Sequence, residues 1–146
     1  MTSTHLGTMV VAAVLLQGVA SPAPAQSLDY EYFKTRVEPI FLKKRPDHVR
    51  CIICHSDRSN NSFRLEKIAS GGKFWTEEQS RRNFEMVSRL VAPGDPAKSL
   101  LLLQPLAPEA GGNAYHTGGR QFASKNDREW KILARWVTGP AAAPAK

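Results

Sequence analysis

Sulfur-containing residues are scarce in this chain of 146 residues, which has two cysteines and three methionines. A structural zinc site needs four ligands, usually from two paired clusters. Besides Cys51 and Cys54, the only candidate ligands among histidines, leaving out His5 near the start, are His48, His55 and His116. The chain also lacks the alternating strand and helix pattern of a dithiol oxidoreductase. A disulfide between the two cysteines would close a loop too short to stabilise much. Structural zinc, dithiol redox chemistry and a simple disulfide are therefore all poor interpretations of these cysteines.

The two cysteines lie in the sequence Cys51-Ile52-Ile53-Cys54-His55. Thiols at positions i and i+3 share one face of a helix, so both can reach the two vinyl groups on one edge of a porphyrin. An imidazole directly after the second thiol is typical of covalent c-type haem attachment, with the histidine as the proximal iron ligand. The pentapeptide therefore predicts one covalent haem c, bound by Cys51, Cys54 and His55. No second Cys-x-x-Cys-His sequence and no internal repeat are present.

The first 25 residues have no lysine or arginine and contain one apolar run, residues 9–16. This run is too short to span about 30 Å of hydrocarbon, which argues against a membrane anchor. The small residues Ala23-Pro24-Ala25 fit a cleavage site, so we expect residues 1–25 to be a signal peptide, although its positive start is missing. The expected localisation is periplasmic or secreted, with no transmembrane span after cleavage.

The remaining chain has the length of one domain, which we expect to cover residues 26–139, followed by a disordered tail, 140–146. The formal charge of +7 lies wholly in this part, with basic clusters at 43–45 and 81–82. Such clusters can orient an acidic redox partner or neutralise haem propionates, and equally well form an ordinary solvated surface. The charges do not form one dense stripe, so we expect no nucleic-acid binding.

Periodic apolar residues predict an all-α fold with helices at both ends of the domain. The first helix is expected after Ser27 or Asp29, and Pro39 is expected to kink or end it. The last helix is expected from Asn126 or Asp127 to about Thr138. The predicted inward residues are Phe33, Val37, Ile40 and Phe41 in the first helix and Trp130, Leu133, Trp136 and Val137 in the last.

Between these helices the pattern predicts smaller elements. A short haem-attachment helix is expected from about Val49, and then an extended piece with alternating Phe63 and Leu65. Thr76 should begin a strong helix, with Glu78 or Gln79 completing a capping box. Its predicted inward residues are Phe84, Val87, Leu90 and Val91, and a further short helix is expected from about Asp95-Pro96 to Leu103. A loop rich in proline and glycine, 107–124, holds His116.

In this order the motifs resemble the planctomycete-type cytochrome c domain. The resemblance covers about residues 30–139. It is carried by 37–41 (Val-Glu-Pro-Ile-Phe), the haem pentapeptide, Phe63-Arg64-Leu65, 93–101 with Pro-Gly-Asp-Pro and Ser-Leu-Leu, 116–119 (His-Thr-Gly-Gly) and Arg135-Trp136-Val137. It implies a small class I-like cytochrome c fold, with the terminal helices packed around one haem. The spacer at 43–48 is longer than the usual pattern.

The sixth iron ligand is not given by the pentapeptide. In class I-like cytochromes it comes from the loop before the last helix, usually as methionine, and this loop contains His116 and no methionine. We therefore expect His116 as the distal ligand, with Met86 as the alternative and an open site as the third possibility. His48 is too close to the anchored edge to reach the other face. One of Trp130 and Trp136 is a candidate for haem contact.

The function expected from these residues is single-electron transfer between redox partner proteins by an exported monohaem c-type cytochrome. The chain itself would not be an enzyme, since no paired carboxylates, serine triad or phosphate loop appear. Two alternatives stay open: a haem protein with an open distal site that binds gas or peroxide, and a haem subunit of a larger oxidoreductase or filament.

Overall fold

The computed structural model describes residues 27–46, 48–58, 63–116 and 118–139. The expected signal peptide, 1–25, and the expected tail, 140–146, lie outside these residues. None of the helices in the described ranges is long and apolar enough to cross a membrane.

The described part of the chain is helical and contains no β-strand, which confirms the predicted all-α class. Its only pairing of extended backbone is an isolated bridge between Leu106 and Phe122. The α-helices are α1 (Tyr30–Tyr32), α2 (Glu38–Leu42), α3 (Glu77–Ser88), α4 (Leu100–Leu103) and α5 (Arg128–Thr138). Two π-helical segments, η1 (Phe33–Val37) and η2 (Ile53–Arg58), and one 3₁₀ turn, η3 (Pro108–Ala110), complete the set.

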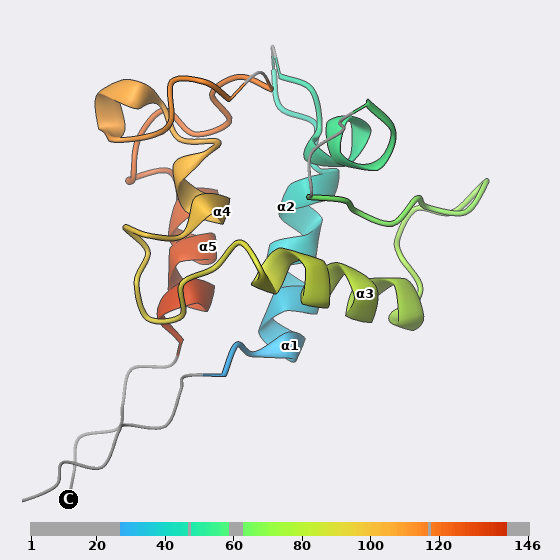
Figure 1. The fold of residues 1–146 in the computed structure, drawn as a ribbon. Coiled ribbons are helices and arrows are strands. Elements are labelled where there is room, and N and C mark those ends of the chain that lie inside the picture. Colours follow the sequence, from blue (N-terminus) through green and yellow to red (C-terminus); the bar gives the residue numbers. More distant parts are fainter. Residues whose placement is uncertain (1–26, 47, 59–62, 117, 140–146) are drawn as a thin grey trace, which may run out of the picture.

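The first helical column is continuous from α1 through η1 to α2 (Figure 1). Asp29 caps it as predicted, its carboxylate accepting a hydrogen bond from the Tyr32 amide. Pro39 was expected to kink or end the helix; it does not end it, because the column runs on to Leu42. A proline inside an α-helix clashes with the carbonyl four residues earlier. Here the turn before Pro39 is widened into a π-helix, in which the Glu38 amide donates to the Phe33 carbonyl, and the wider turn relieves that clash.

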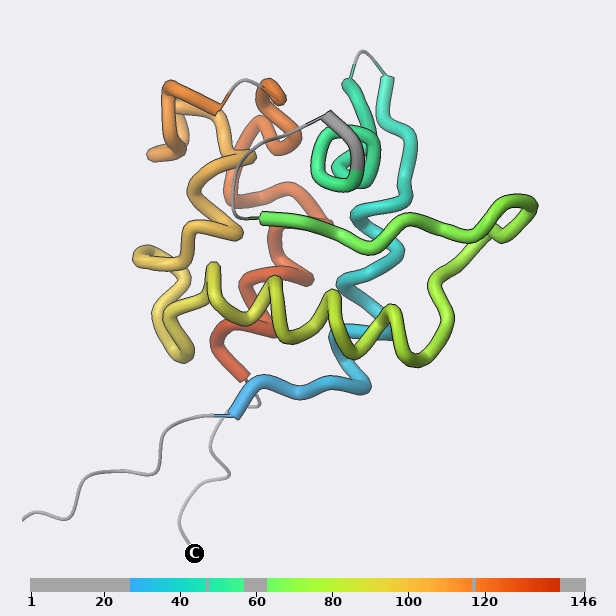
Figure 2. Tube along the Cα trace, turned by 45° about the vertical axis from the view of Figure 1, so that its right-hand side comes forward, coloured from blue at the N-terminus to red at the C-terminus, as the bar shows by residue number. Residues whose placement is uncertain are grey.

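Aromatic packing joins this column to α5 and α3. The Phe33 ring is fully buried, with its centre 5.2 Å from that of Trp136 and 5.4 Å from that of Phe84. The indole nitrogen of Trp136 donates to the Asp29 carbonyl at 2.8 Å. The predicted apolar faces of the two terminal helices therefore cover each other, and α3 lies across the first column (Figures 1 and 2).

The middle of the chain follows the predictions at some positions and departs from them at others. Thr76 and Gln79 form the predicted capping box at the start of α3. The predicted helix from Asp95-Pro96 is shorter than expected, because residues 93–98 form turns and α4 begins only after Ser99. The expected attachment helix begins at Cys51 rather than near Val49. The segment that holds the cysteines and the 107–124 loop lie at the end of the molecule away from α1 (Figure 1).

Candidate haem site

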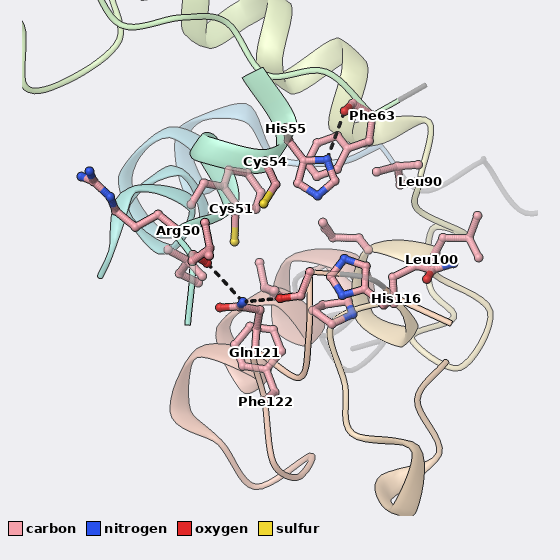
Figure 3. A pocket seen from close by; sticks show the side chains of 18 of the residues that line it. Arg50, Cys51, Cys54, His55, Phe63, Leu90, Leu100, His116, Gln121 and Phe122 are labelled. Carbon is pink, nitrogen blue, oxygen red and sulfur yellow. Dashed lines mark hydrogen bonds between the residues drawn. The ribbon is translucent and has the colours of Figure 1, made fainter. Parts of the chain in front are cut away.

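A largely apolar cavity of about 300 Å³ lies between the cysteine segment and the 107–124 loop (Figure 3). Its apolar walls come from loop residues and from three helices, through Phe41 of α2, Leu101 of α4 and Leu133 of α5. The cavity is also lined by all four residues that the sequence predicted for cofactor binding: Cys51, Cys54, His55 and His116. This combination of apolar walls and a few convergent polar groups is typical of a cofactor site.

The cysteine segment directs both of its thiols to one side. The backbone is helical at Cys51 and continues into η2, so the two sulfurs lie one turn apart and point toward the cavity, beside the His55 ring (Figure 3). The two cysteines do not form a disulfide with each other. Burial raises the pKa of the Cys51 thiol above its ordinary value, so this group is held in its neutral form.

The His55 ring is fixed by the extended piece that follows it. Its Nδ1 lies 3.2 Å from the Phe63 carbonyl oxygen, and the centres of the two rings are 4.2 Å apart. The Leu65 amide also donates to the His55 carbonyl at 2.9 Å. A carbonyl oxygen can only accept, so Nδ1 carries the proton and a neutral ring has its lone pair on Nε2. This tautomer, held by a backbone carbonyl, is usual for a metal-ligating histidine.

The His116 ring is held in the same way from the opposite wall. Its Nδ1 lies 2.9 Å from the Gly119 carbonyl oxygen, which again assigns the proton to Nδ1 and the lone pair to Nε2. Gly119 adopts a left-handed conformation with φ of 81°, which favours glycine. At Gly118 a Cβ atom would lie 3.0 Å from His116 Cε1, so a larger residue there would press on the ring. Glycine at these positions therefore allows the tight turn that orients His116.

The two imidazoles face each other across the cavity. Their ring centres are 6.4 Å apart and their planes differ by only 9°. An iron bonded to two imidazole nitrogens, each about 2 Å away, would place the ring centres about 6 Å apart. The distance between the ring centres is therefore close to the one expected for two imidazoles bound to one iron. In the described residues no three His, Cys, Asp or Glu side chains converge on a bare metal ion, whereas a porphyrin supplies four nitrogens and needs only two axial ligands.

Several other predicted candidates lie away from the cavity. Met86, the alternative ligand, is half-buried on α3 and does not line it. Neither Trp130 nor Trp136 lines it, and Trp136 belongs to the aromatic core instead. The prediction that one tryptophan contacts the haem therefore has no support in the cavity wall.

The basic clusters are largely paired within the chain. Arg45 is buried and its guanidinium pairs with Glu129, which also accepts from Lys43 at 2.7 Å. The two arginines of the second cluster lie on α3. Arg81 pairs with Glu77, and Arg82 pairs with Glu66 and Glu78. Basic residues of both clusters therefore form ion pairs within the chain, which the sequence did not predict.

Among the residues of the cavity wall that sequence reasoning missed is Gln121. Its side chain is almost completely buried and donates to the backbone carbonyls of Val49 and Gly118. No local pattern distinguishes such a glutamine from a solvated one, because its partner Val49 lies in a distant part of the chain. A buried amide of this kind is recognisable only from the folded contacts.

No family model matches the chain, and no curated protein and no solved structure match it. The functional interpretation therefore depends on the residues of the site.

Proposed function

We propose that this chain is a monohaem c-type cytochrome that carries single electrons between redox partners. The observation that supports this most directly is the parallel pair of histidine rings, 6.4 Å apart, beside two thiols that point to the same cavity. A chance pair of histidines has no reason to share this spacing, this alignment and the same Nδ1-protonated tautomer. Haem c is the cofactor that uses two neighbouring thiols and two opposed imidazoles together.

In this proposal Cys51 and Cys54 hold the porphyrin by thioether bonds. Each bond forms when the S–H group adds across a vinyl C=C bond, with sulfur bonding one carbon and hydrogen the other, so no external oxidant or reductant is needed. Burial raises the pKa of the Cys51 thiol, which favours the S–H form that this addition would consume. His55 and His116 would then be the two axial ligands.

Coordination by two imidazoles would set both the redox potential of the haem and its reactivity. When bound, haem c supplies a one-electron couple, and bis-imidazole coordination gives a lower potential than coordination by histidine and methionine. The apolar walls would limit the access of water to a bound haem, and the two carbonyl-bound histidines would be its two axial ligands. A filled sixth position favours electron transfer over the binding of gas or peroxide. The chain would then carry electrons and catalyse no bond chemistry of its own.

The wider features of the proposal follow the sequence. The fold would be class I-like and similar to the planctomycete-type cytochrome c domain, and the protein would be exported to the periplasm or secreted. Exposed apolar side chains at the rim of the cavity, Val49, Leu100 and Tyr115, offer a surface for a redox partner or for a larger complex.

The test is an absorption and electron paramagnetic resonance spectrum of the purified protein. We expect a mass increased by one covalent haem and a ferric low-spin spectrum without the red-region band of sulfur-ligated iron. His116→Ala should convert the ferric protein to a high-spin form, whereas Met86→Leu should leave the spectrum unchanged. A bare polypeptide mass would refute the cofactor, and a six-coordinate, low-spin His116→Ala variant would refute the ligand.

A further inference from the structure

Gln121 connects the two halves of the candidate haem site. The side chain, in a residue only 8% exposed, contacts two separate segments: Arg45 and Val49 lie in one, and Gly118 lies in the other. Its Nε2 donates to the Val49 carbonyl at 3.2 Å and to the Gly118 carbonyl at 3.3 Å, while its Oε1 accepts from Arg45 at 3.4 Å. Val49 lies two residues before Cys51, and Gly118 lies two residues after His116. One amide group therefore links the segment that carries the thiols to the loop that carries the distal histidine (Figure 3).

This link is anchored to the helical core. The Arg45 guanidinium pairs with Glu129 of α5 and lies 5.1 Å from the centre of the Phe122 ring. The Gln121 backbone is also fixed, because its amide donates to the Pro105 carbonyl at 2.8 Å. Both ends of the glutamine are therefore held, and neither carbonyl partner can move away without breaking a hydrogen bond inside a buried site.

We propose that Gln121 is a positioning residue that keeps His116 at bonding distance from the haem iron. This inference rests on the proposed function and extends it to the control of the sixth ligand. Among the described residues, the His116 ring itself is held by its hydrogen bond to the Gly119 carbonyl, and the loop backbone is held on either side by bonds from Asn113 to Leu103 and from Gln121 to Pro105. If the two donated hydrogen bonds are lost, the loop can swing outward and His116 leaves the iron in a larger fraction of molecules.

The chemistry of the side chain makes this proposal specific to an amide. A glutamate at position 121 would have nearly the same size and would still accept from Arg45, but it could not donate to either carbonyl. An alanine would remove all three contacts. Gln121→Glu and Gln121→Ala should therefore behave alike if the donated bonds position His116, and they should differ if bulk or the Arg45 contact is what matters.

Carbon monoxide binding to the reduced holoprotein measures the open fraction, because the gas can bind only after His116 has left. We expect both variants to bind it at least about tenfold faster than the wild type, which corresponds to about 1.4 kcal/mol of lost ligand positioning. The ferric spectrum should show a growing high-spin component, with helical circular dichroism unchanged. Asn126→Ala, which removes an exposed amide that does not line the cavity, is the matched control and should bind at the wild-type rate.

Wild-type rates in both variants would overturn the proposal, and so would a fast Gln121→Ala variant beside an unchanged Gln121→Glu variant. Failure of the cofactor assignment is distinguishable, since the wild-type protein would then carry no haem at all. In that case hydrogen exchange at the Gly119 amide, which donates to the His116 carbonyl, gives the answer. Faster exchange in Gln121→Ala than in the wild type supports the link, and equal exchange refutes it.

Discussion

Replacing the buried carboxylate Glu38 by glutamine should stabilise the protein at neutral pH. The residue is 6% exposed; its Oε2 accepts from Ser80 at 2.9 Å, and its Oε1 has no hydrogen-bond partner among the described residues. Burial raises the pKa of this carboxyl above its ordinary value of 4.5, against the lowering effects of Ser80, Asn83 and Lys34. The charged form is therefore the less favourable one in the folded protein.

The size of the stabilisation can be worked out from Oε1 of Glu38, which has no hydrogen-bond partner among the described residues. A buried polar group without its partner costs about 1–3 kcal/mol, and more when it is charged. Glutamine removes the charge and keeps an oxygen that can accept from Ser80 or from Nδ2 of Asn83, which has no hydrogen-bond partner among the described residues. We expect Glu38→Gln to raise the free energy of unfolding by about 1 kcal/mol at pH 8, which for about 100 residues raises the Tm by about 4 °C.

The stabilisation by Glu38→Gln should be large at high pH and small at low pH. Because the folded pKa is raised, the folded state binds more protons than the unfolded state above pH 4.5, and wild-type stability falls as pH rises through the folded pKa. At about pH 4 both states of the wild type are largely protonated, so the difference between variant and wild type should nearly vanish. The full difference in stability should appear only at pH values above the pKa of Glu38 in the folded protein.

Denaturant unfolding of the purified protein at pH 4 and pH 8, followed by circular dichroism, measures both effects. Glu31→Gln is the matched control, because it makes the same charge change at an exposed position of the same helical column, and it should change stability by less than about 0.5 kcal/mol at both pH values. A Glu38→Gln variant that is less stable than the wild type, or that differs from it equally at both pH values, would refute the reasoning.

Three further changes test other parts of the fold. Gly112→Ala should destabilise the protein by more than about 2 kcal/mol in thermal unfolding, because a Cβ atom there would lie 1.9 Å from the Leu106 carbonyl oxygen; a wild-type Tm would contradict this. Thr76→Ala removes half of the capping box with Gln79 and should cost about 1 kcal/mol in denaturant unfolding, with no loss counting against the box. Cys51→Ala should keep one porphyrin through the remaining thioether, so a bare polypeptide in denaturing mass spectrometry would disagree.

Local signals in the sequence were sufficient for much of the fold. The caps Asp29, Thr76 and Asp127 act on amides within three residues of themselves, so they can be recognised without knowing the tertiary structure. The apolar spacing of the terminal helices likewise predicted which faces are buried. Pro39 was the exception, because a π-helical turn that accommodates a proline leaves no simple pattern in the sequence.

The pentapeptide from Cys51 to His55 was sufficient by itself to predict the kind of site, since the predicted chemistry depends on spacings of three and four residues. Only the tertiary structure decided that the His116 ring lies parallel to that of His55, that Gln121 links their segments, and that Glu38 is buried against α3. Each of these features joins residues more than forty positions apart. Their separation is set by how the helices and the long loop pack, and no local periodicity or capping preference carries that information.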